Sequence, residues 1–153
     1  MVRQAQLSAI LFSALLAGCF SEPPPPGPKA DPVKESWYGE TVTQLAAMDR
    51  DAADFFHKKK EDEASALIQK GEELSARLLA VPHPTLAATE AASDLDELYG
   101  QMLFSNRNYG WARLLFQRNV ARWKNWTPKT EDSAKRLKEA QDEIAECDRR
   151  IVQ

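Results

Sequence analysis

From Val33 onward, apolar residues recur at the spacing of an α-helix in five segments separated by breaks. No segment shows the apolar–polar alternation that is typical of a half-buried strand. Five amphipathic helices can bury their apolar stripes only by packing together. The sequence therefore predicts an all-α domain over residues 33–153, built as an antiparallel bundle or as stacked helical hairpins of about five helices.

Each predicted helix carries a stripe of residues three or four positions apart. The five stripes are Tyr38, Thr41, Leu45, Met48, Ala52, Phe55 and Phe56; Ala64, Leu67, Ile68, Gly71, Leu74, Leu78 and Leu79; Ala88, Ala91, Leu95, Leu98, Tyr99, Met102 and Asn106; Ala112, Leu115, Phe116, Asn119, Val120, Trp123 and Trp126; and Ala134, Leu137, Gln141, Ile144, Cys147 and Ile151.

The breaks between these helices differ in clarity. Val81–Pro84 and Thr127–Pro128 contain prolines that disfavour a continuous helix. Asn108–Gly110 predicts a turn, and Thr130, followed by two acids, predicts a capped helix start. The charged run 57–63 has neither Gly nor Pro, so a continuous helix and a turn near Lys59 both remain open, and we favour the turn.

Composition places the chain with single soluble domains. It has 153 residues, a net charge of -3, and 43% hydrophobic and 28% charged residues. A mild negative charge argues against a nucleic-acid binder, because such proteins usually carry a basic excess. Two cysteines cannot make a disulfide framework, so the apolar core must hold the fold.

The first 18 residues are typical of an export signal. A short positive end at Met1–Arg3 precedes the uncharged, largely apolar run Leu7–Leu16. This run is too short to span a bilayer, which needs about 20 apolar residues. We therefore expect residues 1–18 to direct export rather than to anchor the protein.

The sequence Leu16-Ala17-Gly18-Cys19 resembles the bacterial lipobox, an aliphatic residue and two small residues before a cysteine. In bacterial lipoproteins these three residues are recognised by the lipoprotein signal peptidase, and the cysteine carries diacylglycerol. The resemblance implies that Cys19 begins the mature chain and is acylated, which gives a lipid anchor in the membrane. The alternative is an ordinary secreted protein that is cut after a small residue.

The position after the cysteine bears on localisation. Phe20 stands where an aspartate tends to retain enterobacterial lipoproteins in the inner membrane. The resemblance therefore implies a cell-envelope location, at the outer membrane and facing the periplasm if the cell has two membranes.

By this resemblance, residues 19–32 comprise a lipidated cysteine and a proline-rich linker. Prolines favour an extended polyproline conformation of about 3.1 Å per residue, so we expect a disordered tether that holds the domain away from the membrane. The alternative is a docking segment for a proline-recognising partner.

Part of the helical body resembles a tetratricopeptide repeat. Gly100, Leu103, Ala112 and Phe116 match that family's spacing of small and large residues, with leucine in an aromatic place. The resemblance implies stacked helical hairpins that act in protein binding. Any helical hairpin also needs small residues where its helices cross, which explains the same pattern without the family.

The stretch Ser105–Thr130 contains six basic residues and no acid. On a helical wheel Arg118 and Arg122 share one flank of the apolar stripe, whereas Lys124 falls on the other flank. We expect these flanks to pair with acids of the last helix, for which the candidates are Glu139, Asp142, Glu143 and Glu146. The alternative is contact between Arg118, Arg122 and Lys124 and an anionic partner.

The remaining candidates for chemistry are few. Trp111, Trp123 and Trp126 are predicted in the core or at its rim, with Trp126 and Leu114 the candidates for an exposed contact. His57 and His83 have no ligand-spaced neighbours, and we predict no metal, cofactor or catalytic residues. Cys147 is predicted to act as a small core residue.

These observations favour a membrane-anchored envelope protein that acts as a non-catalytic helical scaffold or protein-interaction module. Its expected partners are the membrane, through the lipid, and another envelope protein, with no nucleic acid. The alternative function is binding of an anionic envelope polymer or lipid headgroup through the basic helix.

Overall fold

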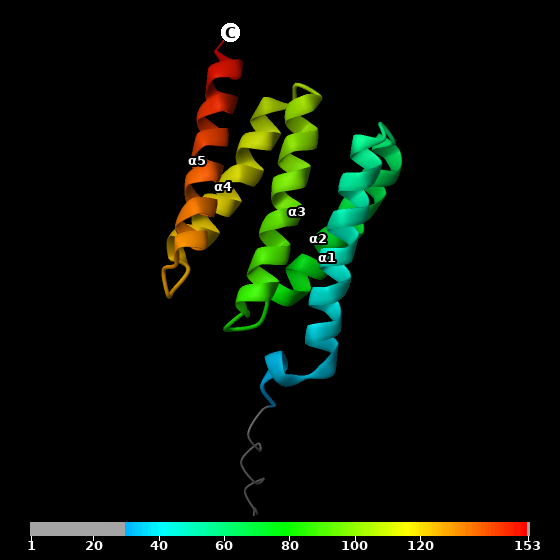
Figure 1. Cartoon of the computed structure of the whole chain (residues 1–153), viewed down its shortest axis with the longest axis vertical. Coiled ribbons are helices and arrows are strands. Elements are labelled where there is room, and N and C mark those ends of the chain that lie inside the picture. The colour runs from blue at the N-terminus through cyan, green and yellow to red at the C-terminus, as the bar shows by residue number, and fades with distance from the viewer. Residues whose placement is uncertain (1–29, 153) are drawn as a thin grey trace, which may run out of the picture.

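The computed structural model describes residues 30–152, which form five α-helices and one short 3₁₀ helix (Figure 1). No strand occurs in this range, and the predicted all-α class is confirmed. The elements are η1 (Pro32–Lys34), α1 (Ser36–His57), α2 (Glu61–Leu79), α3 (Leu86–Ser105), α4 (Tyr109–Asn125) and α5 (Glu131–Ile151).

Two helices begin at threonine caps. The Thr85 hydroxyl accepts a hydrogen bond from the Ala88 N–H at 3.2 Å, and Thr130 forms a reciprocal capping box with Ser133 at the start of α5. Each cap satisfies N–H groups that have no partner within the helix. The predicted start of the last helix at Thr130 is confirmed.

Helices α1 and α3 end in the same backbone motif without a glycine. Lys59 and Arg107 adopt positive φ values of 62° and 60°. The next N–H in each case reaches back across the turn, from Lys60 to the Phe55 carbonyl at 2.9 Å and from Asn108 to the Leu103 carbonyl at 2.8 Å. The turn near Lys59 is confirmed.

The turn between α3 and α4 lies earlier than predicted. It is formed by residues 106–108, and Tyr109 and Gly110 already belong to α4. The prediction of a turn at 108–110 followed the glycine, but the residue in the left-handed conformation is Arg107.

The helices run antiparallel in chain order, with α3 at the centre (Figure 1). The hairpin of α1 and α2 packs on one side of α3, and α4 packs on the other side. Helix α5 packs along α4. The loops that follow α1 and α3 share one end of the domain with the carboxyl terminus.

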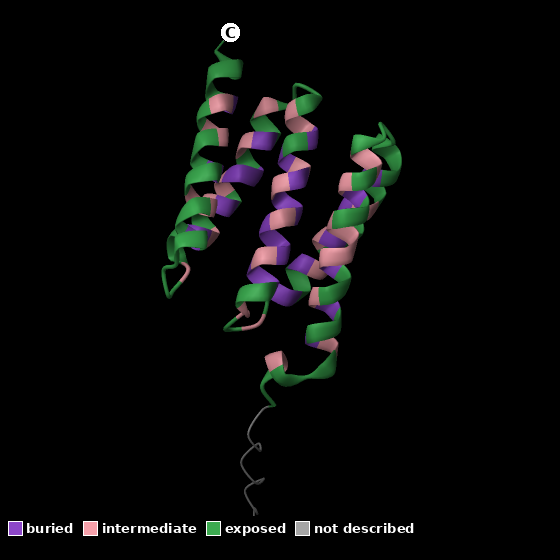
Figure 2. Ribbon diagram, viewed as in Figure 1, coloured by how far each residue is buried: buried purple, intermediate pink, exposed green. Residues whose placement is uncertain are grey.

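The largest core cluster lies between α1, α2 and α3, where most of the buried positions of α3 are found (Figure 2). A smaller cluster joins α4 to α5 through Ala112, Phe116 and Cys147. Glycine is required where helices approach closely. A Cβ on Gly71 would lie 2.9 Å from Leu95, and one on Gly100 would lie 2.5 Å from the Phe116 ring.

The stripes predicted for the first four helices point inward, apart from Asn106, which is exposed at the end of α3. The stripe predicted for the last helix was wrong in part, because Ala134, Gln141 and Ile151 are exposed. The buried residues of α5 are Ser133, Ala140 and Cys147. Small side chains at these positions let α5 pack against α4, so Ser133 and Ala140 are buried in place of their neighbours Ala134 and Gln141, whereas Cys147 is buried as predicted.

Candidate functional site

An exposed apolar surface lies on α4, and we call it the Trp111 face. Trp111 and Leu114 project with 68% and 48% of their surface exposed. Beside them is a hollow of about 370 Å³, which is lined by Glu72, Tyr99, Leu103, Trp111, Leu114, Leu115 and Arg118. Large exposed apolar side chains beside a hollow are typical of a protein-contact surface.

Sequence reasoning placed the exposed tryptophan at the wrong position. Leu114 is exposed as predicted, but Trp126 is partly buried, with its ring edge-on to Trp123 at a centroid distance of 6.4 Å. Trp111, predicted in the core or at its rim, is instead exposed. It lies outside the stripe of Ala112, Leu115 and Phe116, and this offset was the available signal.

A buried ion-pair cluster lies next to the Trp111 face. Asp96, on α3, is 1% exposed. Its carboxylate forms ion pairs with Arg122 at 2.9 Å and with Arg118 at 3.1 Å. Arg118 also reaches Glu72 of α2 at 3.4 Å. The cluster therefore joins α2, α3 and α4.

Burial dominates the electrostatics of Asp96. Desolvation raises the pKa of its carboxyl above the ordinary value, against the opposing charges of Arg122 and Arg118. The cluster is also tied to the core, because Arg122 donates to the Asn119 side chain and Asn119 donates to the Ser93 carbonyl at 3.0 Å. Such a network fixes the relative position of α3 and α4.

The predicted pairing of the two arginines with the last helix was wrong. Their acids come from α2 and α3, because this flank of α4 faces α3 rather than α5. On the other flank Arg113 does reach α5, where it meets Asp148 at 2.6 Å. Lys124 is exposed and forms no ion pair within residues 30–152.

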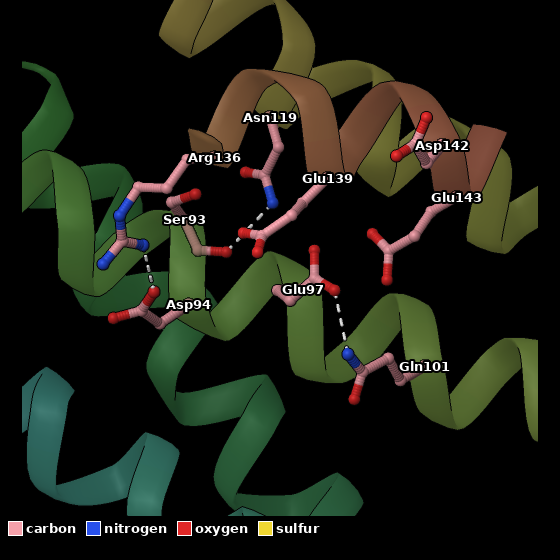
Figure 3. A pocket seen from close by; sticks show the side chains of 9 residues that line it. All are labelled: Ser93, Asp94, Glu97, Gln101, Asn119, Arg136, Glu139, Asp142 and Glu143. Carbon is pink, nitrogen blue, oxygen red and sulfur yellow. Dashed lines mark hydrogen bonds and ion pairs between the residues drawn. The ribbon is translucent and has the colours of Figure 1, made fainter. Parts of the chain in front are cut away.

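A second hollow, of about 500 Å³, separates α3 from α5, and we call it the α3–α5 cleft (Figure 3). Its lining is polar and mostly acidic. The residues are Ser93, Asp94, Glu97, Gln101, Asn119, Arg136, Glu139, Asp142 and Glu143. Arg136 is held by Asp94 at 2.6 Å and by Asp132 at 2.9 Å.

Glu143 is the most perturbed group in the α3–α5 cleft. Burial, followed by the hydrogen bond and charge of Glu97, raises the pKa of Glu143 from 4.5 to about 9. Gln101 opposes this shift by hydrogen bonding, and Glu139 adds to it. Glu143 Oε2 is buried and has no hydrogen-bond partner. At neutral pH the Glu143 carboxyl therefore holds a proton.

We expect Glu143→Gln to flatten the dependence of stability on pH. Because the pKa of Glu143 is higher in the folded than in the unfolded state, the wild type loses stability as the pH rises from 4.5 to about 9. The variant keeps a neutral group there and should be more stable at pH 8 by about 1–2 kcal/mol, after discounting for partial exposure. Urea unfolding across this pH range measures the difference.

The exposed neighbour provides the control. Glu139→Gln removes a carboxylate from the same cleft but should leave most of the slope in place, since Glu139 is exposed and contributes least to the shift. Equal slopes for wild type and Glu143→Gln would contradict the assignment of the proton to Glu143.

The remaining candidates for chemistry stand apart from both hollows. Cys147 is buried, and burial raises the pKa of its thiol. His57 is the last residue of α1, His83 lies in the loop between α2 and α3, and both are exposed. The described part of the chain contains no cluster of ligating side chains that would hold a metal ion. Leu16, Ala17, Gly18 and Cys19 lie outside the described residues, as does almost all of the proline-rich linker.

No protein-family model, curated protein or solved structure matches this chain. None of the described helices is long and apolar enough to cross a membrane. The described residues define the class as a five-helix all-α domain.

Proposed function

We propose that this protein is a membrane-anchored lipoprotein of the bacterial envelope and that its helical body acts as a non-catalytic scaffold that docks another envelope protein. The observation that carries the docking role is the Trp111 face. Trp111 and Leu114 expose a large apolar area to solvent. The other tryptophans of the domain are buried or partly buried. Burying this area against a partner supplies the driving force for association.

The anchor follows from the sequence that precedes the domain. The lipobox-like Leu16-Ala17-Gly18-Cys19 supports acylation of Cys19, and the prolines up to Pro32 support an extended tether. In a cell with two membranes, Phe20 after the cysteine favours the outer membrane, with the domain in the periplasm.

The hairpin of α3 and α4 supports a tetratricopeptide-like arrangement. The Phe116 ring lies against Gly100, and these are two of the four positions on which the sequence resembles that family. Consecutive hairpins stacked through α3 would give the domain separate surfaces for partners.

The alternative, binding of an anionic polymer or lipid headgroup, is less well supported. Asp96 already neutralises much of the charge of Arg118 and Arg122, and Arg122 is only 11% exposed. Of the three residues predicted to contact an anionic partner, only Lys124 forms no ion pair with a carboxylate among the described residues. A single exposed lysine does not make a basic patch.

We expect Trp111→Ser combined with Leu114→Ser to abolish recovery of a partner when the lipidated protein is purified from native membranes. The two side chains are exposed, so the melting temperature should change little. Leu86→Ser is the matched control, because Leu86 is 40% exposed on α3 away from this face. Recovery of the same proteins by wild type and by both variants would contradict the docking role of the Trp111 face.

A further inference from the structure

The space between α3 and α5 is a single groove with a polar and an apolar part. The α3–α5 cleft of about 500 Å³ and an adjoining hollow of about 310 Å³ share two lining residues, Gln101 and Glu143. The two hollows therefore meet at these side chains. Figure 3 shows Glu143 reaching from α5 toward Gln101 and Glu97 of α3.

The polar part carries an excess of negative charge. Asp94, Glu97, Glu139, Asp142 and Glu143 line it, against the single cation Arg136, which Asp94 and Asp132 already hold. Lys135 and Lys138 pair with Glu139 and Asp142 along α5, but these pairs are exposed and contribute about 0–1 kcal/mol each. An incoming cation would therefore meet carboxylates that are weakly compensated.

The apolar part continues the same groove beyond Gln101 and Glu143. Its lining adds Phe104 and Ser105 of α3, Phe116 of α4 and Glu146 of α5. The Phe104 ring is held edge-on against Tyr109 at a centroid distance of 5.0 Å, which fixes one wall. This part suits an apolar side chain.

We infer that the α3–α5 groove docks a cationic amphipathic segment of a partner protein, with lysine or arginine in the polar part and an apolar side chain against Phe104 and Phe116. Charge complementarity selects the cation, and the adjoining apolar hollow selects a polypeptide over a simple polyamine. This inference deepens the proposed scaffold role, on which it rests. It concerns a different surface from the Trp111 face, so an experiment can disprove docking at one surface without disproving docking at the other.

Docking of a cation has a consequence for the proton that Glu143 holds. The groups that act on Glu143 are Glu97 and Gln101 from α3 and Glu139 from α5, and α4 contributes only the neutral Asn119 and Phe116 to the groove. An ammonium or guanidinium group that enters the polar part lowers the pKa of Glu143, which burial and the neighbouring carboxylates raise to about 9. Glu143 then releases its proton to the solvent as the cation binds.

The test uses the chain from Cys19 onward with Cys19→Ser, so that no lipid competes for an amphipathic peptide. The probe is a fluorescent synthetic peptide with lysine and leucine at helical spacing, and binding is followed by anisotropy. Replacing its leucines by serine, or its lysines by glutamate, should weaken binding at least about tenfold. Equal binding of either peptide, or of spermine alone, would overturn the inference.

Two variants locate the binding site. Glu139→Gln with Asp142→Asn should weaken binding about tenfold, whereas Glu73→Gln with Asp51→Asn removes the same charge from exposed positions elsewhere and should not. Gln101→Trp should block the groove, and Gln69→Trp, an exposed glutamine on α2, is its control. Equal loss in a variant and its control would place the peptide elsewhere.

Calorimetry near pH 8 in buffers of different ionisation enthalpy measures the number of protons released when the peptide binds. The wild type should release up to one proton per peptide bound, and Glu143→Gln should release none. Trp111→Ser with Leu114→Ser should leave both binding and proton release unchanged. A loss of peptide binding in that variant would contradict the independence of the two surfaces, and an absence of proton release from the wild type would overturn the groove assignment.

Discussion

Phe116→Ala lowers the free energy of unfolding by about 3–5 kcal/mol, the range for loss of a buried phenylalanine. Phe116 is 1% exposed and lies where α3, α4 and α5 meet, against Gly100 and in the cluster with Ala112 and Cys147. Its ring fills the space that the missing side chain of Gly100 leaves. Gly100 cannot close the resulting cavity, so the loss includes a cavity term as well as the transfer term. Chemical denaturation measures the change.

Leu114→Ala is the matched control for this substitution. Leu114 is on the same helix but is 48% exposed, and its loss should cost less than about 1 kcal/mol. Equal losses for the two variants would mean that the buried face of α4 has been assigned wrongly.

Charge reversal of Arg118 and Arg122 together destabilises the domain by at least about 3–5 kcal/mol, because it removes both partners of a buried carboxylate. In Arg118→Glu with Arg122→Glu, two acids would face Asp96, which is 1% exposed, and Glu72 would lose its partner as well. We expect a large fall in melting temperature.

Lys124→Glu is the control for this variant and should leave the melting temperature nearly unchanged, because Lys124 is exposed. The same proteins are assayed for retention on anionic vesicles and on cell-wall sacculi at low and moderate salt. An unchanged melting temperature in the double variant, with retention that only the wild type shows, would contradict the structural role and favour the anionic-partner function.

The fold class and four of the five buried faces follow from periodicity, because each of those helices has neighbours that cover a wide apolar stripe. For helix α5, periodicity did not predict the buried face correctly. It packs mainly on one helix through Ser133, Ala140 and Cys147, and the larger apolar residue Ile151 lies beyond the contact. For a narrow contact of small residues, the apolar pattern does not define the face.

The helix ends and the ion pairs depend on information that is not local. Lys59 and Arg107 adopt the left-handed conformation that glycine usually marks, so neither turn carries its usual signal. The partner of Arg122 is Asp96, 26 residues away, and the choice between α3 and α5 depends on how α4 is rotated in the fold. The exposure of Trp111 could have been predicted from the sequence, because Trp111 lies outside the buried stripe of Ala112, Leu115 and Phe116 on α4.

Tethering of the helical domain to a membrane is tested most directly by the mass of the amino-terminal residue of the mature protein. Because Leu16-Ala17-Gly18-Cys19 resembles a lipobox, protein extracted from native membranes should begin at Cys19 and carry diacylglycerol on its sulfur. Cys19→Ser should prevent lipid attachment and leave an unprocessed precursor. Mass spectrometry that instead finds a mature terminus without acyl mass on Cys19 would contradict the account.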